Sequence, residues 1–213
     1  MIRRDKKTSE IRISYNETLD PVFAFYSQYS PLGKKLGWDS WQPPTKEEIV
    51  KNIQRYRKIW KPFEKPFFDM MEKITSAPCI NKIIDIHIVS GNPRQIGFPI
   101  IIRSGFSDEK FVITLIHELI HYYIHIHNLP ESFVNKKNAR ETKLTRKHIV
   151  VFSIMKYFFN DIMKQPQLIT SAKEISDKHS TKEYTQAWNE AENNYFKIIK
   201  TFEAYATKKM PKY

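Results

Sequence analysis

The chain has few of the residue types that several common kinds of functional site require. Among its 213 residues Cys79 is the single cysteine, so no internal disulfide and no cage of thiolate metal ligands can form within the chain. Five glycines leave no glycine-rich phosphate loop and no collagen-like repeat. No apolar run is long enough to span a bilayer, and the charged N-terminal residues lack the apolar core of a signal peptide. We therefore expect a soluble, cytoplasmic protein that has no membrane partner.

Composition indicates a folded chain with a strong positive charge. Apolar residues make up 41% of the sequence and aromatic residues 14%, which is typical of a globular protein. The net charge is +12 and the sequence pI is about 9.6. Such a charge favours nucleic acid or another polyanion as a partner. Lysines scattered over a solvated surface would give the same total, and no aromatic-interleaved nucleic-acid motif is present, so charge leaves both interpretations open.

The most informative stretch is the apolar run from Phe111 to Ile126, which is predicted to form a helix that starts near Ser107-Asp108-Glu109. His117 and His121 are four residues apart, so both project from one face of that helix. Two imidazoles at this spacing can bind one tetrahedral metal ion at about 2.0–2.1 Å each. Glu118 follows the first histidine, where zinc peptidases carry the carboxylate that takes a proton from metal-bound water. The alternative is an amphipathic helix whose histidines only form hydrogen bonds.

Two downstream residues are candidates for the third ligand that a catalytic zinc site usually has. The sequence from Glu141 to about Met163 is predicted to form a long helix. Glu141 and His148 lie one heptad apart on it, so either side chain could face the metal. Spacing alone does not choose between them. If Glu141 is not a ligand, it could orient a metal-bound histidine instead.

The motifs together resemble those of a known peptidase family. The segment HELIHYYIHIHNL, followed by His148-Ile149-Val150-Val151-Phe152 with Met155 and Asn160 further on, is similar to the SprT-like group of HExxH zinc metallopeptidases, which includes the Spartan DNA–protein crosslink proteases. The resemblance covers roughly residues 98–170. The chain departs from the family pattern at Ile149, where a glycine is usual, and it lacks the cysteine-rich zinc ribbon.

The resemblance implies a specific site and chemistry. One Zn²⁺ would be bound by His117, His121 and His148, and Glu118 would act as the general base. The substrate would be a protein or peptide, and nucleic-acid-associated protein is one expected class. The second hypothesis is a non-catalytic module that binds zinc, nucleic acid or protein. The presence of Glu118 favours the enzyme, because a structural zinc site needs no such carboxylate and is usually closed by four ligands.

Other residues near the motif have weaker roles in this prediction. We considered Tyr122, Tyr123 and Arg103 as donors to the oxyanion that forms when a carbonyl is attacked. The remaining histidines are not assigned as ligands; these are His87, His125, His127 and His179.

The predicted fold is α+β and zincin-like: a small sheet packed on the metal helix, with additional N- and C-terminal helices. The expected strands are Ile11–Tyr15, Lys82–Val89 and Phe98–Arg103, and Leu168–Thr170 is expected to be either a short strand or an extended link. Phe98–Arg103 is expected beside the cleft, where a free edge would pair with extended substrate. Capping boxes predict helix starts at Thr45–Glu48 and Ser180–Glu183, and Pro62 and Pro66 predict a separate, kinked helix over Phe63–Ile74. We expect three regions: a mostly helical region 1–95, a zincin-like catalytic core 96–170 and a helical extension 171–213.

Overall fold

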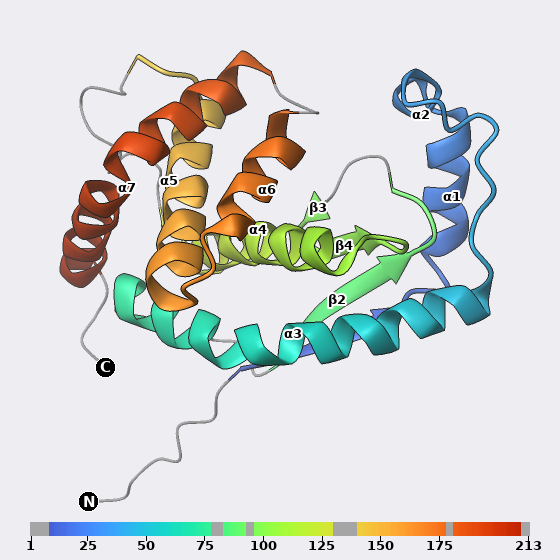
Figure 1. Cartoon of the computed structure of the whole chain (residues 1–213), viewed down its shortest axis with the longest axis horizontal. Coiled ribbons are helices and arrows are strands. Elements are labelled where there is room, and N and C mark those ends of the chain that lie inside the picture. Colours follow the sequence, from blue (N-terminus) through green and yellow to red (C-terminus); the bar gives the residue numbers. More distant parts are fainter. Residues whose placement is uncertain (1–8, 78–82, 93–95, 130–139, 178–180, 210–213) are drawn as a thin grey trace, which may run out of the picture. The chain divides into compact units, whose positions relative to one another are not determined.

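The computed structural model describes residues 9–77, 83–92, 96–129, 140–177 and 181–209. Within these ranges the chain forms a four-stranded mixed sheet and seven α-helices, which confirms the α+β class (Figure 1). The strands are β1 (Glu10–Tyr15), β2 (Ile83–Val89), β3 (Ile96–Gly97) and β4 (Ile100–Arg103). The helices are α1 (Asp20–Tyr29), α2 (Pro31–Lys35), α3 (Lys46–Thr75), α4 (Asp108–Ile126), α5 (Lys143–Tyr157), α6 (Gln167–Asp177) and α7 (Lys182–Lys209), with a π-helical turn η3 (Phe158–Ile162) after α5.

The sheet has the strand order β1-β2-β4-β3. β2 pairs in parallel with β1 and with β4, whereas β3 pairs antiparallel with β4. The three isoleucines of β4 are all buried, so both faces of this strand are covered, and the alternating isoleucines of β2 fill the core. The expected strands at Ile11–Tyr15 and Lys82–Val89 are confirmed as β1 and β2, although Lys82 lies outside the described residues. The expected strand Phe98–Arg103 is shorter, and β3 rather than β4 forms the edge.

The chain divides into two compact units. The sheet unit consists of Ser9–Pro62 and Ile83–Tyr122, and the helical unit contains Phe63–Lys82 and Tyr123–Tyr213. This division does not test the three regions expected from the sequence, which stay a prediction. Among the described helices, none combines the length and apolar composition needed to cross a membrane.

In each unit a stacked pair of buried aromatic rings joins two long helices. In the sheet unit Tyr56 of α3 stacks on Phe111 of α4, with ring centroids 3.9 Å apart and planes at 2°. In the helical unit Phe152 of α5 stacks on Trp188 of α7, at 4.2 Å and 11°. α5 and α7 run side by side over much of their length (Figure 1). These pairs fix the two helices, α4 and α5, on which the candidate site residues lie.

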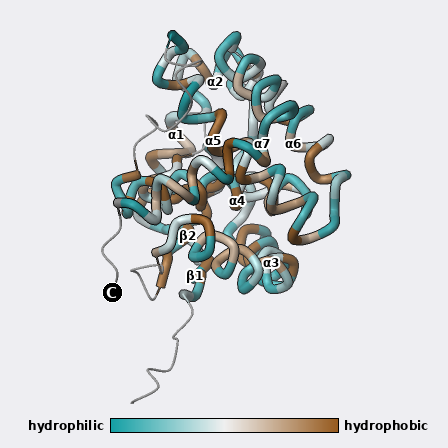
Figure 2. The backbone as a smooth tube through the Cα atoms, turned by 90° about the vertical axis from the view of Figure 1, so that its left-hand side faces the viewer, coloured by the Kyte–Doolittle hydropathy of each residue, from teal (hydrophilic) through white to brown (hydrophobic). Residues whose placement is uncertain are grey.

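Helix α3 begins where the sequence predicts but does not break where expected. The capping box is formed: the Thr45 amide donates to Glu48 Oε2 at 2.8 Å, and Thr45 Oγ1 accepts from the Glu48 amide at 3.2 Å. The predicted separate helix after Pro62 is wrong, because α3 continues through both prolines to Thr75. Pro62 is exposed and Pro66 half-exposed, so water can solvate the carbonyl groups that the prolines leave without donors. Hydrophobic and hydrophilic residues alternate along the turns of α3 (Figure 2). The hydrophobic residues form a stripe on one side of the helix, and those of them that are buried anchor α3 in the core.

Three further expectations change in the C-terminal half. The long helix predicted from Glu141 instead starts at Lys143, because Thr142 Oγ1 accepts from the Thr145 amide at 3.1 Å and caps it. The short strand or extended link expected at Leu168–Thr170 is wrong: these residues belong to α6, which starts directly after Pro166. The predicted C-terminal helix is present as α7, although Ser180 of its proposed capping box lies outside the described residues.

Candidate metal site

Helix α4 places His117 and His121 as the sequence predicts. The first turn of α4 carries Asp108 and Glu109, which suit the positive end of the helix dipole, and the Lys110 amide donates to Ser107 Oγ at 3.3 Å. Leucine and isoleucine residues on the inner faces of α4 are fully buried; they are Leu115, Ile116, Leu119 and Ile120. The apolar residues therefore fix the rotation of the helix, and the two histidines stay half-buried.

The two imidazoles are arranged as ligands of one ion would be. Their Nε2 atoms lie 3.1 Å apart and their ring centroids 4.7 Å apart. Two nitrogens bound tetrahedrally at 2.0–2.1 Å would be separated by about 3.3 Å. The pair can therefore bind a metal ion with only a small adjustment of the side chains.

Glu118 lies in a confined space between α4 and the edge strand. It is 8% exposed, which is low for a carboxylate. A Cβ atom at Gly97 of β3 would lie 2.7 Å from Glu118 Oε2 and 3.5 Å from His121 Cβ, so a side chain at position 97 would displace the carboxylate from this position. Sequence reasoning missed this contact. Gly97 is the second and last residue of β3, and a glycine in a strand, which often marks a close approach, was the available signal.

Helix α5 holds His148 in a buried position. Its imidazole is 4% exposed, and Nδ1 donates to the carbonyl oxygen of Leu144 at 2.9 Å. That bond fixes the tautomer in which Nε2 keeps its lone pair, as in most metal-binding histidines. Burial lowers the pKa of His148 to about 4, so the ring is neutral at pH 7, which is the form that binds metals.

Tyr184 of α7 was not anticipated as a neighbour of the site. Its ring centroid lies 4.2 Å from that of His148, and Phe152 packs on the same imidazole at 5.4 Å. No local pattern in the sequence connects positions 148 and 184. Tyr184 and Phe152 restrict the His148 ring to one orientation.

The three histidines form a candidate metal site. One ligand nitrogen from each of His117, His121 and His148 lies within 4.8 Å of the other two. Three imidazole ligands suit zinc and other late transition metals and leave an open position for water. Glu141, the alternative third ligand, does not belong to this group. It precedes α5, so its expected position one heptad before His148 on the same helix is wrong.

The other described histidines lie apart from this group. His125 is exposed. His87 of β2 accepts a hydrogen bond from the Asn16 side chain at 3.2 Å through Nδ1. His127 packs on Tyr123 with ring centroids 4.7 Å apart, and burial lowers its pKa. His179 lies outside the described residues.

All three residues considered as oxyanion donors contact other groups. The Tyr123 hydroxyl donates to the Ala77 carbonyl at 2.7 Å. The Arg103 guanidinium lies over the rings of Trp38 at 4.6 Å and Phe106 at 4.9 Å. The third, Tyr122, is buried and packs on Phe98.

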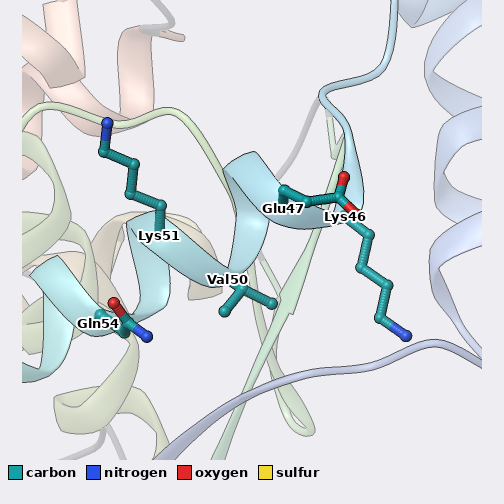
Figure 3. Close-up of a pocket in the computed structure, with 5 residues that line it drawn as sticks. All are labelled: Lys46, Glu47, Val50, Lys51 and Gln54. Atoms are coloured by element: carbon teal, nitrogen blue, oxygen red, sulfur yellow. The ribbon is translucent and has the colours of Figure 1, made fainter.

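A surface hollow of about 350 Å³ on α3 is unrelated to the histidines (Figure 3). Its lining comes from one helix, with Lys46, Glu47, Val50, Lys51 and Gln54. Because the lining side chains all belong to one helix, the hollow has no opposing wall to enclose a ligand.

Comparison with known proteins does not identify the chain. No protein-family model matches it, and no match is found among curated proteins or solved structures. The case for a function therefore depends on the site residues themselves.

Proposed function

We propose that this protein is a zinc-dependent metallopeptidase of the HExxH, zincin-like type, as its resemblance to the SprT-like group implies. The observation that supports it is the group of His117, His121 and His148 with the buried carboxylate of Glu118 on the same helix as the first two. Three imidazoles and a carboxylate outside the ligand set match the residues that hydrolytic zinc sites require.

Each of these residues has a distinct part in the proposed reaction. The three histidines would hold Zn²⁺, which lowers the pKa of a bound water to about 7 and polarises the substrate carbonyl. Glu118 accepts the proton from the attacking water and returns it to the leaving amine. The absence of a side chain at Gly97 leaves room for the Glu118 carboxylate beside the edge strand. The Leu144 carbonyl keeps His148 in the tautomer that binds metal.

The edge of the sheet offers a place for an extended substrate. β4 has neighbours on both sides, whereas β3 is the last strand in the sheet order. A peptide that pairs with β3 would pass beside Gly97 and hence beside Glu118. The substrate-binding strand is therefore β3, and not the segment Phe98–Arg103 expected from the sequence.

A basic segment around the start of α5 supports protein bound to nucleic acid as one class of substrate. Arg140, Lys143, Arg146 and Lys147 precede His148 within eight residues, and the first turn of α5 contains no acidic residue. Cations there can bind phosphate groups in a salt-dependent way. The proposal that the substrate is bound to nucleic acid extends the proposed function, and it is tested by comparing cleavage with and without DNA.

The first test measures bound zinc in the purified protein and its variants. We expect one zinc ion per chain in the unchanged protein. His148→Ala should weaken zinc binding by more than the roughly 10–100-fold that follows loss of an outer partner of a ligand. Glu141→Ala and His125→Ala are matched controls that should keep full zinc content. Unchanged zinc binding in His148→Ala would remove His148 from the site.

The second test measures cleavage of casein with and without single-stranded DNA. Glu118→Gln should keep its zinc and lose about 10²–10⁴-fold in rate, because the general base is removed. Glu109→Gln, on the exposed first turn of the same helix, is the control. Full zinc content in a protein that cleaves nothing would favour the non-catalytic binding module instead.

A further inference from the structure

Two arginines of the sheet differ in how their positive charges are balanced. Arg12 of β1 is exposed, and its guanidinium forms two hydrogen bonds with the Asp85 carboxylate, at 2.5 Å and 3.0 Å. Arg103, the last residue of β4, is half-buried, and within the part of the chain that the structure describes no carboxylate pairs with it. Arginine is rarely buried without a partner, so the more buried of the two guanidinium groups is the one that lacks a counter-ion.

The contacts of Arg103 are to aromatic rings. Its guanidinium lies over the Trp38 ring at 4.6 Å and over the Phe106 ring at 4.9 Å. These rings attract the cation, but they have no oxygen that would accept hydrogen bonds from its five N–H groups. Burial lowers the pKa of Arg103, because the surroundings disfavour its charge. A bound oxyanion would supply both the opposite charge and the hydrogen-bond acceptors.

Further positive charge gathers around Phe106. Lys110 Nζ lies over the same ring at 4.6 Å, and the Arg55 guanidinium donates to the Phe106 carbonyl oxygen at 2.7 Å. The carboxylate of Asp108 lies 3.4 Å from Arg55 Nε, so this acidic group is placed to balance Arg55 rather than Arg103. Several cations around one residue favour a phosphate group, which can carry two negative charges, over a single carboxylate.

The end of β4 has room for a ligand. β1, β2 and β4 are parallel, so their carboxyl ends lie at one edge of the sheet, which is where open parallel sheets bind ligands. Gly105, two residues after Arg103, has a φ of +80°. A Cβ atom at Gly105 would meet no other heavy atom of the described residues within 4 Å, apart from its chain neighbours. The space beside the β4–α4 connection is therefore open.

We propose that Arg103, with Lys110 and Arg55 beside it, binds the phosphate group of a ligand at the carboxyl end of β4. The site lies apart from the three histidines, because Lys110 is about 10 Å along α4 before His117. Inorganic phosphate and the phosphodiester backbone of nucleic acid offer the same chemistry, and the experiment distinguishes these two sources. The proposal requires neither zinc binding nor peptidase activity.

The test measures binding of inorganic phosphate to the full-length, zinc-loaded protein by calorimetry, with chloride used to keep the ionic strength constant. Arg103→Gln should weaken binding by about tenfold or more, and Arg103→Lys by less. Arg12→Gln is the matched control and should bind as the unchanged protein does, because Arg12 already has a carboxylate partner. Equal phosphate affinity in Arg103→Gln and the unchanged protein would overturn the proposal.

Thermal unfolding separates ligand binding from packing. Phosphate should raise the melting temperature of the unchanged protein and of Arg12→Gln, but not that of Arg103→Gln. If Arg103→Gln lowers the melting temperature equally with and without phosphate, the arginine only packs on the rings, and the proposal fails. Lys110→Gln, which keeps Arg103 in place, should weaken phosphate binding severalfold and gives the same comparison if Arg103→Gln does not fold.

Two further arms identify the site and the source of the phosphate. A zinc ion with an open position can itself bind phosphate. Binding that persists in His148→Ala and is lost in Arg103→Gln supports the site at β4, and the reverse result overturns it. Oligothymidylate with and without a 5′-phosphate is then tested: Arg103-dependent binding of both oligonucleotides indicates the phosphodiester backbone, and binding of only the 5′-phosphorylated form indicates a phosphate monoester. Cleavage of casein is measured separately, so failure of this proposal leaves the peptidase proposal standing.

Discussion

The two units hold their candidate metal-binding histidines in different ways. In the sheet unit His117 and His121 lie one turn apart on a single helix, so their proximity follows from helix geometry. In the helical unit His148 depends on a hydrogen bond to Leu144 and on rings from α5 and α7 that pack around it. The pair is thus determined locally, whereas the orientation of His148 requires correct packing of α5 against α7. Damage to the helical packing should therefore weaken zinc binding through His148 first.

The largest expected effect follows removal of the stacked ring that joins α5 to α7. Trp188→Ala should lower the free energy of unfolding by about 3–5 kcal/mol, because Trp188 is 2% exposed and stacks on Phe152. Urea unfolding followed by circular dichroism gives the stability. Zinc affinity, measured in the absence of urea, should fall toward that of His148→Ala.

Phe196→Ala is the control for the Trp188 prediction. Phe196 is an aromatic residue of the same helix but is 55% exposed, so its removal should change stability by less than about 0.5 kcal/mol. If Trp188→Ala is strongly destabilised but binds zinc as tightly as the unchanged protein, His148 does not depend on the α5–α7 packing.

The same contrast explains what could be predicted from the sequence. The strands β1 and β2, the capping box at Thr45 and the HELIH helix follow from local periodicity and capping, and the structure confirms them. Spacing left His148 and Glu141 as equal candidates, because a difference of two residues in the helix start decides whether Glu141 is helical at all. The contacts of Gly97 with Glu118 and of Tyr184 with His148 join segments that are distant in sequence, and no local pattern shows such pairs.

A smaller loss of stability is expected when the hydrogen bonds of the Tyr56 hydroxyl in the sheet unit are removed. The Tyr56 hydroxyl accepts from the Phe106 amide at 2.8 Å and donates to the Phe106 carbonyl at 3.1 Å, two residues before α4 begins. Burial raises the pKa of Tyr56, so the hydroxyl stays protonated near neutral pH. Tyr56→Phe keeps the stacked ring but leaves a buried amide without its acceptor, so it should cost about 1–3 kcal/mol.

Hydrogen exchange locates the effect of Tyr56→Phe. The Phe106 amide should exchange faster, and exchange in α5 should change little, because α5 lies in the other unit. The control is Tyr29→Phe, which also removes a tyrosine hydroxyl. Because Tyr29 is 60% exposed, this change should leave the free energy of unfolding almost unchanged. Equal destabilisation by both variants would show that the bonds to Phe106 are not what anchors α4.

The smallest effect compares the caps of the two histidine-bearing helices. Thr142→Ala removes the oxygen that accepts from the Thr145 amide at 3.1 Å, and it should cost about 1 kcal/mol. The first turn of α5 includes Leu144, whose carbonyl holds His148, so fraying there should also weaken zinc binding severalfold. Ser107→Ala at the start of α4 removes the hydrogen bond that Ser107 Oγ accepts from the Lys110 amide, which is longer at 3.3 Å. Ser107 lies more than two helical turns before His117. Zinc affinity should therefore fall more in Thr142→Ala than in Ser107→Ala, with Thr142→Ser close to the unchanged protein. The reverse order would mean that the pair on α4, rather than His148, is the less firmly held part of the site.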